Sequence, residues 1–266
     1  MLLFPAGLCY LLAWGFGFFH SRKKPGGAKY FYIFSILGFV LQTAALGCLA
    51  FKTGRLPIGN SYELTESVAW AIVLVDCAAS AILGARVAGS MALFVAAVLS
   101  ILPPCCPSFS ACVFEAAPAL KPDLAALHGA FAVLSYAFLC LCAMFSGVYL
   151  FQIRALKRRS GDLLSGDFLP LPKILRFARR SLGLACLGMA LSVLIGLLAA
   201  SSADSGFFML LKFSAGGFLF LAMLGLLWLS FKRDLSGRTF ALLSLILFAL
   251  SILILIPIEL RNVEIL

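Results

Sequence analysis

The sequence contains few charged residues. Only 12% of its 266 residues are Asp, Glu, Lys or Arg, whereas 63% are hydrophobic and the mean hydropathy is +1.08. A soluble globule of this length needs far more polar surface to cover its core. The composition therefore excludes a soluble protein and predicts a single integral membrane domain over residues 1–266, with the lipid bilayer as its main partner.

Several motifs of soluble enzymes are absent as well. The chain has no Gly-x-x-x-x-Gly-Lys-Ser/Thr phosphate loop, no His-Glu-x-x-His zinc helix and no Gly-x-Ser-x-Gly nucleophile elbow. We therefore find no basis for an ATPase or a hydrolase. We expect no enzyme with turnover of its own.

Long apolar runs occupy most of the chain, and a run of about 20 residues crosses a hydrocarbon core of roughly 30 Å. The sequence predicts an all-α, polytopic transmembrane helix bundle of about eight spans. The predicted spans are 1–19, 30–51, 67–83, 87–102, 127–153, 181–200, 207–231 and 239–260. Only three residues separate the third and fourth spans, so a count of seven stays open.

The net charge of +10 is divided unevenly between the loops. Most of the 21 Lys and Arg residues lie in alternate loops, at positions 22–29, 86, 154–180 and 232–238. By the positive-inside rule these loops face the cytoplasm and both termini face outside. No basic residue precedes the first apolar run, so we expect a retained helix rather than a cleaved leader. This distribution explains the charge without nucleic acid as a partner.

Histidine is scarce, with only His20 and His128 in the chain. His128 lies at the predicted outer end of the fifth span. At 100° per residue, one side of this helix carries His128, Ser135, Leu139, Cys142 and Ser146. Small and polar residues on one stripe of a span face the bundle interior. The ring is therefore either a hydrogen-bonded histidine at headgroup level or an axial ligand of haem iron.

The start of the third span is rich in acidic residues. One face of this helix carries Glu63, Glu66 and Trp70. Carboxylates at an outward helix N-terminus are stabilised by the helix dipole, which is the structural interpretation. In the functional interpretation, Tyr62 and Glu63 line an outer cavity opposite His128, where a carboxylate fixes the tautomer of the ring or accepts its proton.

Asp76 lies near the middle of the third span, where an ionised carboxylate costs at least about 2.5 kcal/mol. It is either a proton relay of a proton-coupled transporter or a protonated acid bonded to a serine of another helix. No pair of broken helices recurs in two halves of the chain, which is the usual sign of a transporter.

The nine cysteines divide by predicted location. Cys105, Cys106 and Cys112 lie in the outward loop 103–124, where Cys112 can pair with either of the other two. A thiol-exchange or metal role and a structural role both stay open for this loop. The other six lie inside predicted spans and are expected to be small packing residues.

Two segments together resemble one known family. PALKPDLAALHGAFAVLSYAFLCLCAMFSGVYLFQIRALKRR is similar to a helix of the cytochrome c assembly protein family (CcsA/HemX-like), in which a histidine opens a span that ends in a basic cytoplasmic segment. GRLPIGNSYELTESVAW resembles the outward Pro-x-x-Asn-x-Tyr-Glu segment of that family, which leads into a span with a tryptophan. The two segments stand in the family's order.

The resemblance implies a protein of the bacterial cytoplasmic (inner) membrane that binds or delivers haem at its outer face. Its partners would be other cytochrome c biogenesis proteins and apocytochrome c. His128 would ligate the iron, and Tyr62, Glu63 and Trp70 would belong to the same site. The haem propionates would pair with Lys212, Lys121 or Arg55.

The chain departs from the family in two places. Neither the loop 201–208 nor the start of the seventh span contains a tryptophan, and Glu259 stands near the position of an expected second histidine. The iron would therefore be five-coordinate, or would take water, Met209 or a partner's residue as a weak second ligand. This departure favours the HemX-like branch and leaves open a regulatory or scaffold protein without haem.

Overall fold

The computed structural model describes residues 3–17, 27–59, 61–83, 89–105, 122–157, 170–200, 207–232 and 235–260. Within these ranges the chain forms eight helices and no strand. The helices are α1 (Leu3–Gly15), α2 (Gly27–Thr53), α3 (Ser61–Leu83), α4 (Gly89–Cys105), α6 (Pro122–Lys157), α8 (Leu171–Ala200), α9 (Phe207–Lys232) and α10 (Gly237–Leu260). The all-α prediction is confirmed, and each predicted span overlaps one helix.

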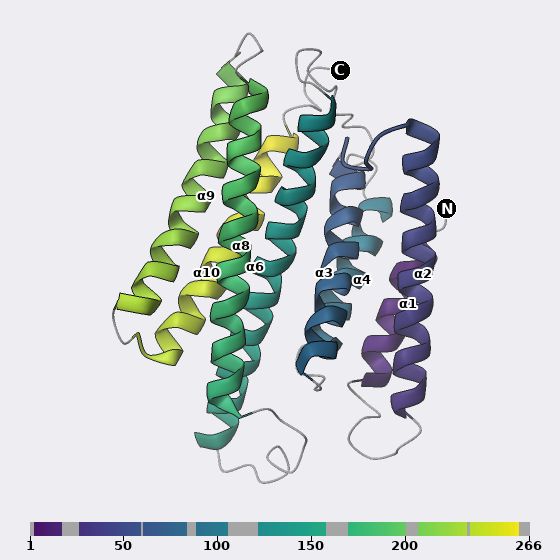
Figure 1. The fold of residues 1–266 in the computed structure, drawn as a ribbon. Helices are drawn as coiled ribbons and strands as arrows, with labels where there is room; N and C mark the ends of the chain where they lie inside the picture. The colour runs from purple at the N-terminus through teal and green to yellow at the C-terminus, as the bar shows by residue number, and fades with distance from the viewer. Residues whose placement is uncertain are drawn as a thin grey trace.

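Consecutive helices run in opposite directions (Figure 1). One end of the bundle holds the turn between α2 and α3, the start of α6 and the end of α8, and we call it the His128 end. The opposite end holds the end of α6 and the starts of α8 and α10. We call it the basic end, because Arg154, Lys157, Lys173 and Arg238 lie there.

Four helices contain segments long and apolar enough to cross a membrane, which supports a membrane protein. These segments are Lys29–Thr53, Tyr62–Ala81, Asp123–Lys157 and Leu171–Leu198. The described parts of α1, α4, α9 and α10 are apolar but shorter. Large apolar side chains such as Leu187, Leu221 and Ile246 are exposed on the outside of the bundle, as expected for a surface that meets lipid.

Most of the helices are longer than the apolar runs that predicted them, and the difference is largest for α6 and α8. α6 has 36 residues, about 54 Å at 1.5 Å per residue, and exceeds a ~30 Å hydrocarbon core. Its start is favoured by Pro122 in the first turn, where a proline costs no hydrogen bond, and by the acidic Asp123 beside it. α8 begins at Leu171 because its first turns are amphipathic, with Ile174 and Ala178 buried.

The buried apolar side chains form two clusters. The first joins α1 to α4 and includes Tyr10, Phe31, Val73 and Leu93. The second joins α6, α8, α9 and α10 with one side of α3 and α4, and its largest buried side chains include Phe145, Phe240, Leu182 and Met223. α3 contributes to both clusters and therefore connects the two halves of the molecule.

The stripe predicted on the fifth span faces the bundle interior. Ser135, Leu139, Cys142 and Ser146 are all fully buried. The Oγ of Ser135 donates to the carbonyl of Ala185 on α8 at 2.7 Å, and a Cβ added to Gly188 would lie 3.2 Å from the Cβ of Ser135. Small residues thus let α6 and α8 approach closely, as is common between helices in membranes.

Candidate functional site

His128 is held in one orientation by Ser192 of α8. The ring is half-buried, and its Nδ1 lies 2.7 Å from the carbonyl oxygen of Ser192. A carbonyl oxygen only accepts, so Nδ1 carries the proton and donates it. The Oγ of Ser192 donates to the carbonyl of His128 at 3.1 Å and lies 3.1 Å from Nδ1. In a neutral ring this assignment places the lone pair on Nε2.

Ser192 is a site residue that the sequence analysis missed. In one interpretation of the sequence a carboxylate fixes the tautomer, whereas in the structure a backbone carbonyl lies at Nδ1. The two contacts have the same spacing along each helix. His128 and Ser135 are seven residues apart on α6. Their partners Ser192 and Ala185 are seven residues apart on antiparallel α8. The ring therefore belongs to the contact between α6 and α8.

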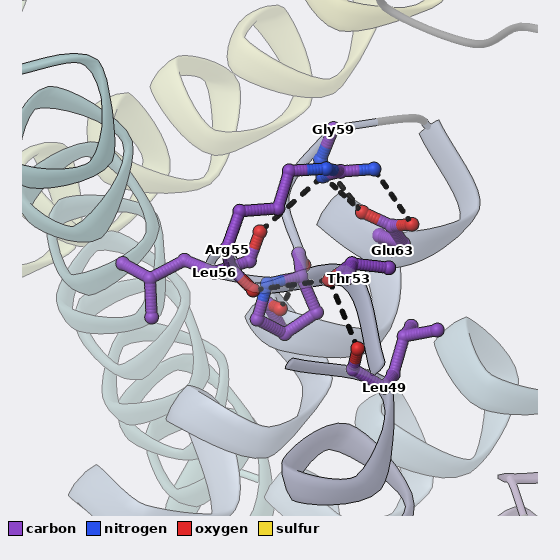
Figure 2. A network of polar contacts seen from close by, with 8 residues as sticks. Leu49, Thr53, Arg55, Leu56, Gly59 and Glu63 are labelled. Atoms are coloured by element: carbon purple, nitrogen blue, oxygen red, sulfur yellow. Dashed lines mark hydrogen bonds and ion pairs between the residues drawn. The ribbon is translucent and has the colours of Figure 1, made fainter. Parts of the chain in front are cut away.

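Glu63 forms an ion pair with Arg55 across the turn between α2 and α3 (Figure 2). Arg55 Nη1 donates to Oε2 at 2.8 Å, Nη2 donates to Oε1 at 3.3 Å, and the Gly59 amide adds a bond to Oε2 at 2.8 Å. This two-pronged geometry is the strongest that an arginine and a carboxylate make. Gly54 begins the turn with a φ of +65°, a conformation that favours glycine at a helix end.

The Arg55 turn and His128 lie at the same end of the bundle. Ile58 of this turn packs against Gly129, the residue after His128, so closely that a Cβ on Gly129 would overlap its side chain. Tyr62 is half-buried in the first turn of α3. The Arg55 side chain is 43% exposed, whereas that of Glu63 is 7% exposed. The turn therefore presents its cation, and not its carboxylate, to the surroundings.

Trp70 contacts α2, whereas the side chain of Lys212 lies outside the described part of the structure. The indole Nε1 of Trp70 donates to Thr43 at 2.9 Å, and the ring stacks on Phe39 with centroids 5.9 Å apart, so Trp70 faces α2. Lys212 belongs to α9, and its side chain lies outside the described part of the structure. His20, Lys121 and the side chain of Met209 also lie outside it.

A buried polar network around Glu66 is the second feature that sequence reasoning missed. The Oε2 of Glu66 accepts bonds of 2.9 Å from Gln42 Nε2 and from Ser100 Oγ, and the hydroxyl of Tyr10 donates to Gln42 Oε1 at 2.8 Å. These residues come from α1, α2, α3 and α4, and all four are fully buried. Glu66 Oε1 is buried without a hydrogen-bond partner in the described part of the chain.

Asp76 is also buried, at 7% exposure, and makes no hydrogen bond or ion pair with another described residue. The serine contact expected in one interpretation is therefore not seen within the described ranges. Among the cysteines, Cys9, Cys140, Cys142 and Cys186 are buried as predicted, whereas Cys48 and Cys77 are exposed. The side chains of Cys105, Cys106 and Cys112 lie outside the described residues.

A scan against protein-family models and a search of curated proteins found no match to this chain. Within the described ranges, no group of three or more His, Cys, Asp and Glu side chains is placed to hold a metal ion. A haem, whose iron is carried by its own porphyrin, needs only one such side chain. His128 is one described side chain of a kind that can ligate haem iron.

Proposed function

We propose that this protein handles haem at the outer face of a bacterial inner membrane during cytochrome c biogenesis. The observation that supports it is the bond from His128 Nδ1 to the Ser192 carbonyl. Histidines that ligate metals usually donate their second ring nitrogen in this way, because the bond fixes the tautomer and makes the ligating nitrogen more basic. The identity of the ligand as haem is inferred from the resemblance of the segments around His128 and Glu63 to the cytochrome c assembly family.

The described residues fit a haem carrier with one strong protein ligand. Nε2 of His128 would bind the iron, and Arg55 at the same end would offer a cation to a propionate. Haem would supply a redox-active iron and the vinyl groups that attach to apocytochrome c. In the structure Glu63 neutralises Arg55, so a propionate would have to share or displace this carboxylate. A single firm ligand suits a carrier that releases its cargo.

The proposal includes a topology of eight spans with the His128 end and both termini outside. The uneven distribution of basic residues supports it. Reporter fusions after Arg159 and Lys232 should report the cytoplasm, and fusions after Pro107 and at the C-terminus should report the outside. A cytoplasmic C-terminus would contradict this topology and put His128 on the opposite side.

The haem proposal is tested by expressing the protein with ample haem and recording the Soret band after purification in mild detergent. Wild type and the control His20→Ala should carry haem, whereas His128→Ala should lose it. Free imidazole added to His128→Gly should restore the band, because the small ligand takes the place of the missing ring. A haem-free wild type would instead favour a regulatory or scaffold protein without haem, and equal haem in all variants would mean that His128 does not ligate the iron.

Proton-coupled transport is a second candidate function, favoured by the burial of Asp76 without a described hydrogen bond. An ionisable acid inside a span is costly, and such residues often mark proton pathways. In vesicles loaded with a pH-sensitive dye, Asp76→Asn should abolish proton movement that the wild type supports. Asp123→Asn, which changes an exposed acid at the start of α6, is the matched control. Equal proton movement in both variants would exclude this role for Asp76.

A further inference from the structure

A pocket of about 140 Å³ lies at the basic end, between α6 and α10. It is lined by Leu150, Ile153, Arg154, Lys157, Arg238 and Leu242. A cavity of roughly 10–15 Å³ holds a single ordered water, so this pocket has room for a group of several non-hydrogen atoms. It lies at the opposite end of the bundle from His128.

Three cations converge on this pocket without a described counter-charge. Arg154 and Lys157 are three residues apart in the last turn of α6. Arg238 is in the first turn of α10. The single ion pair in the described part of the chain is Arg55–Glu63, at the other end. Like charges that share a pocket repel each other. A bound anion would attract all three cations and offset this repulsion.

Local structure fixes the position of Arg238 beside α6. Ser236 caps the start of α10, because its Oγ accepts a bond from the amide of Thr239 at 3.2 Å. Gly237 packs directly against the hydroxyl end of Tyr149 on α6, where any Cβ would overlap the phenol. The close approach of the two helices therefore sets the third cation next to Arg154 and Lys157.

The rest of the lining is aliphatic, and the apolar surface continues away from the charges. Leu242 is 42% exposed, and Ile246, one turn further along α10, is 63% exposed. Phe151 of α6 is also exposed, at 50%. A free phosphate or a nucleotide would leave these apolar groups uncovered. A ligand with a negatively charged head and a hydrocarbon tail would cover both parts.

We propose that this pocket binds the headgroup of an anionic phospholipid. The phosphate would lie among Arg154, Lys157 and Arg238, and an acyl chain would follow Leu242 and Ile246 along α10. Basic pockets between membrane helices recognise lipid headgroups in this way. The site goes beyond haem handling and does not depend on it.

The test uses the full-length protein in an uncharged detergent, with bound lipid measured by native mass spectrometry. Phosphatidylglycerol should bind at least about tenfold more tightly than phosphatidylcholine, since the pocket selects negative charge. The double variant Arg154→Gln/Arg238→Gln should lose this preference. The control Lys173→Gln/Arg176→Gln removes two exposed charges of α8 that do not line the pocket, and it should retain the preference.

Glycerol phosphate and inorganic phosphate serve as competitors that lack a tail, and neither should displace the lipid at equal concentration. Displacement by either would assign the pocket to a soluble anion and overturn the lipid proposal. Equal binding of the two lipids to the wild type would overturn it as well, with no variant needed. Equal losses in both double variants would show that general surface charge, and not this pocket, attracts the lipid.

Discussion

The helices within each half of the molecule are held together by a different kind of contact. Between α1 and α4, side chains from four helices bond to one another in the network of Tyr10, Gln42, Glu66 and Ser100. Between α6 and α10, the buried hydroxyls mostly donate to backbone carbonyls, as Ser135 does to Ala185, and apolar side chains fill the remaining space. The first half depends on matched polar partners, and the second depends on close packing.

This difference teaches where a single substitution should be costly. A side chain that loses its partner in an apolar interior keeps its full desolvation penalty, so damage to a network spreads to its other members. A carbonyl inside a helix already accepts a backbone bond, so it stays satisfied when an additional hydroxyl is removed. Polar changes should therefore be costly between α1 and α4 and mild in α6 to α10, where changes of volume should dominate.

The largest effect is expected for Gln42→Leu. This change removes a donor to Glu66 and to Ser100, and it also removes the acceptor of the Tyr10 hydroxyl. The free energy of unfolding should fall by about 3 kcal/mol, because several buried polar groups lose a partner at once. Reversible unfolding by SDS in mixed micelles measures this loss.

A double-mutant cycle separates the network from simple repacking. In Gln42→Leu/Glu66→Leu the two facing polar groups are both replaced by apolar ones, so the combined loss should be smaller than the sum by about 1 kcal/mol or more. Strictly additive losses would mean that Gln42 and Glu66 act independently. The half formed by α1 to α4 would then not be held together by a network.

The second effect in size is expected for Gly188→Leu in the contact between α6 and α8. A Cβ at this position already lies 3.2–3.3 Å from Ser135 atoms and 3.4 Å from the Phe131 carbonyl, so a larger side chain must push the helices apart. We expect a loss of about 2 kcal/mol in the same unfolding measurement, the usual size for overpacking. Under the haem proposal the Soret band should weaken too, since His128 and Ser192 meet across the same two helices.

Gly183→Ala is the matched control, because its Cβ would meet no atom within 4 Å. It should be neutral or stabilising by up to about 1 kcal/mol, as expected when alanine replaces glycine inside a helix. If both glycine variants lose the same free energy, close approach is not what holds α6 to α8.

The sequence predicted the helices well because each is a long apolar run, and such a run permits few alternatives in lipid. The inward stripe of Ser135, Leu139, Cys142 and Ser146 followed from helical periodicity alone and is confirmed. The early start of α8 was missed, since its first turns are amphipathic and fall below an apolar threshold.

The candidate site was harder to predict because partners on different helices are not encoded by spacing along one of them. His128 was singled out correctly as an inward-facing ring, but its partner Ser192 is 64 residues away. Glu66 was grouped with Glu63 as part of an acidic helix end, yet Arg55 neutralises one and Gln42 bonds the other. A lone glutamine in the second apolar run was the available signal for the network.

The smallest effect is expected for Ser135→Ala, and it gives the most sensitive comparison between the halves. Ser135 is fully buried, but its Oγ donates to the Ala185 carbonyl, which belongs to the helical bonding of α8. The loss should be about 0.6 kcal/mol, the average for such bonds between membrane helices. Ser230→Ala should change the stability less still, because among the described residues its hydroxyl donates to Leu227 of its own helix. If Ser135→Ala were as damaging as Gln42→Leu, packing alone would not hold α6 against α8. Both halves would then depend on polar contacts in the same way.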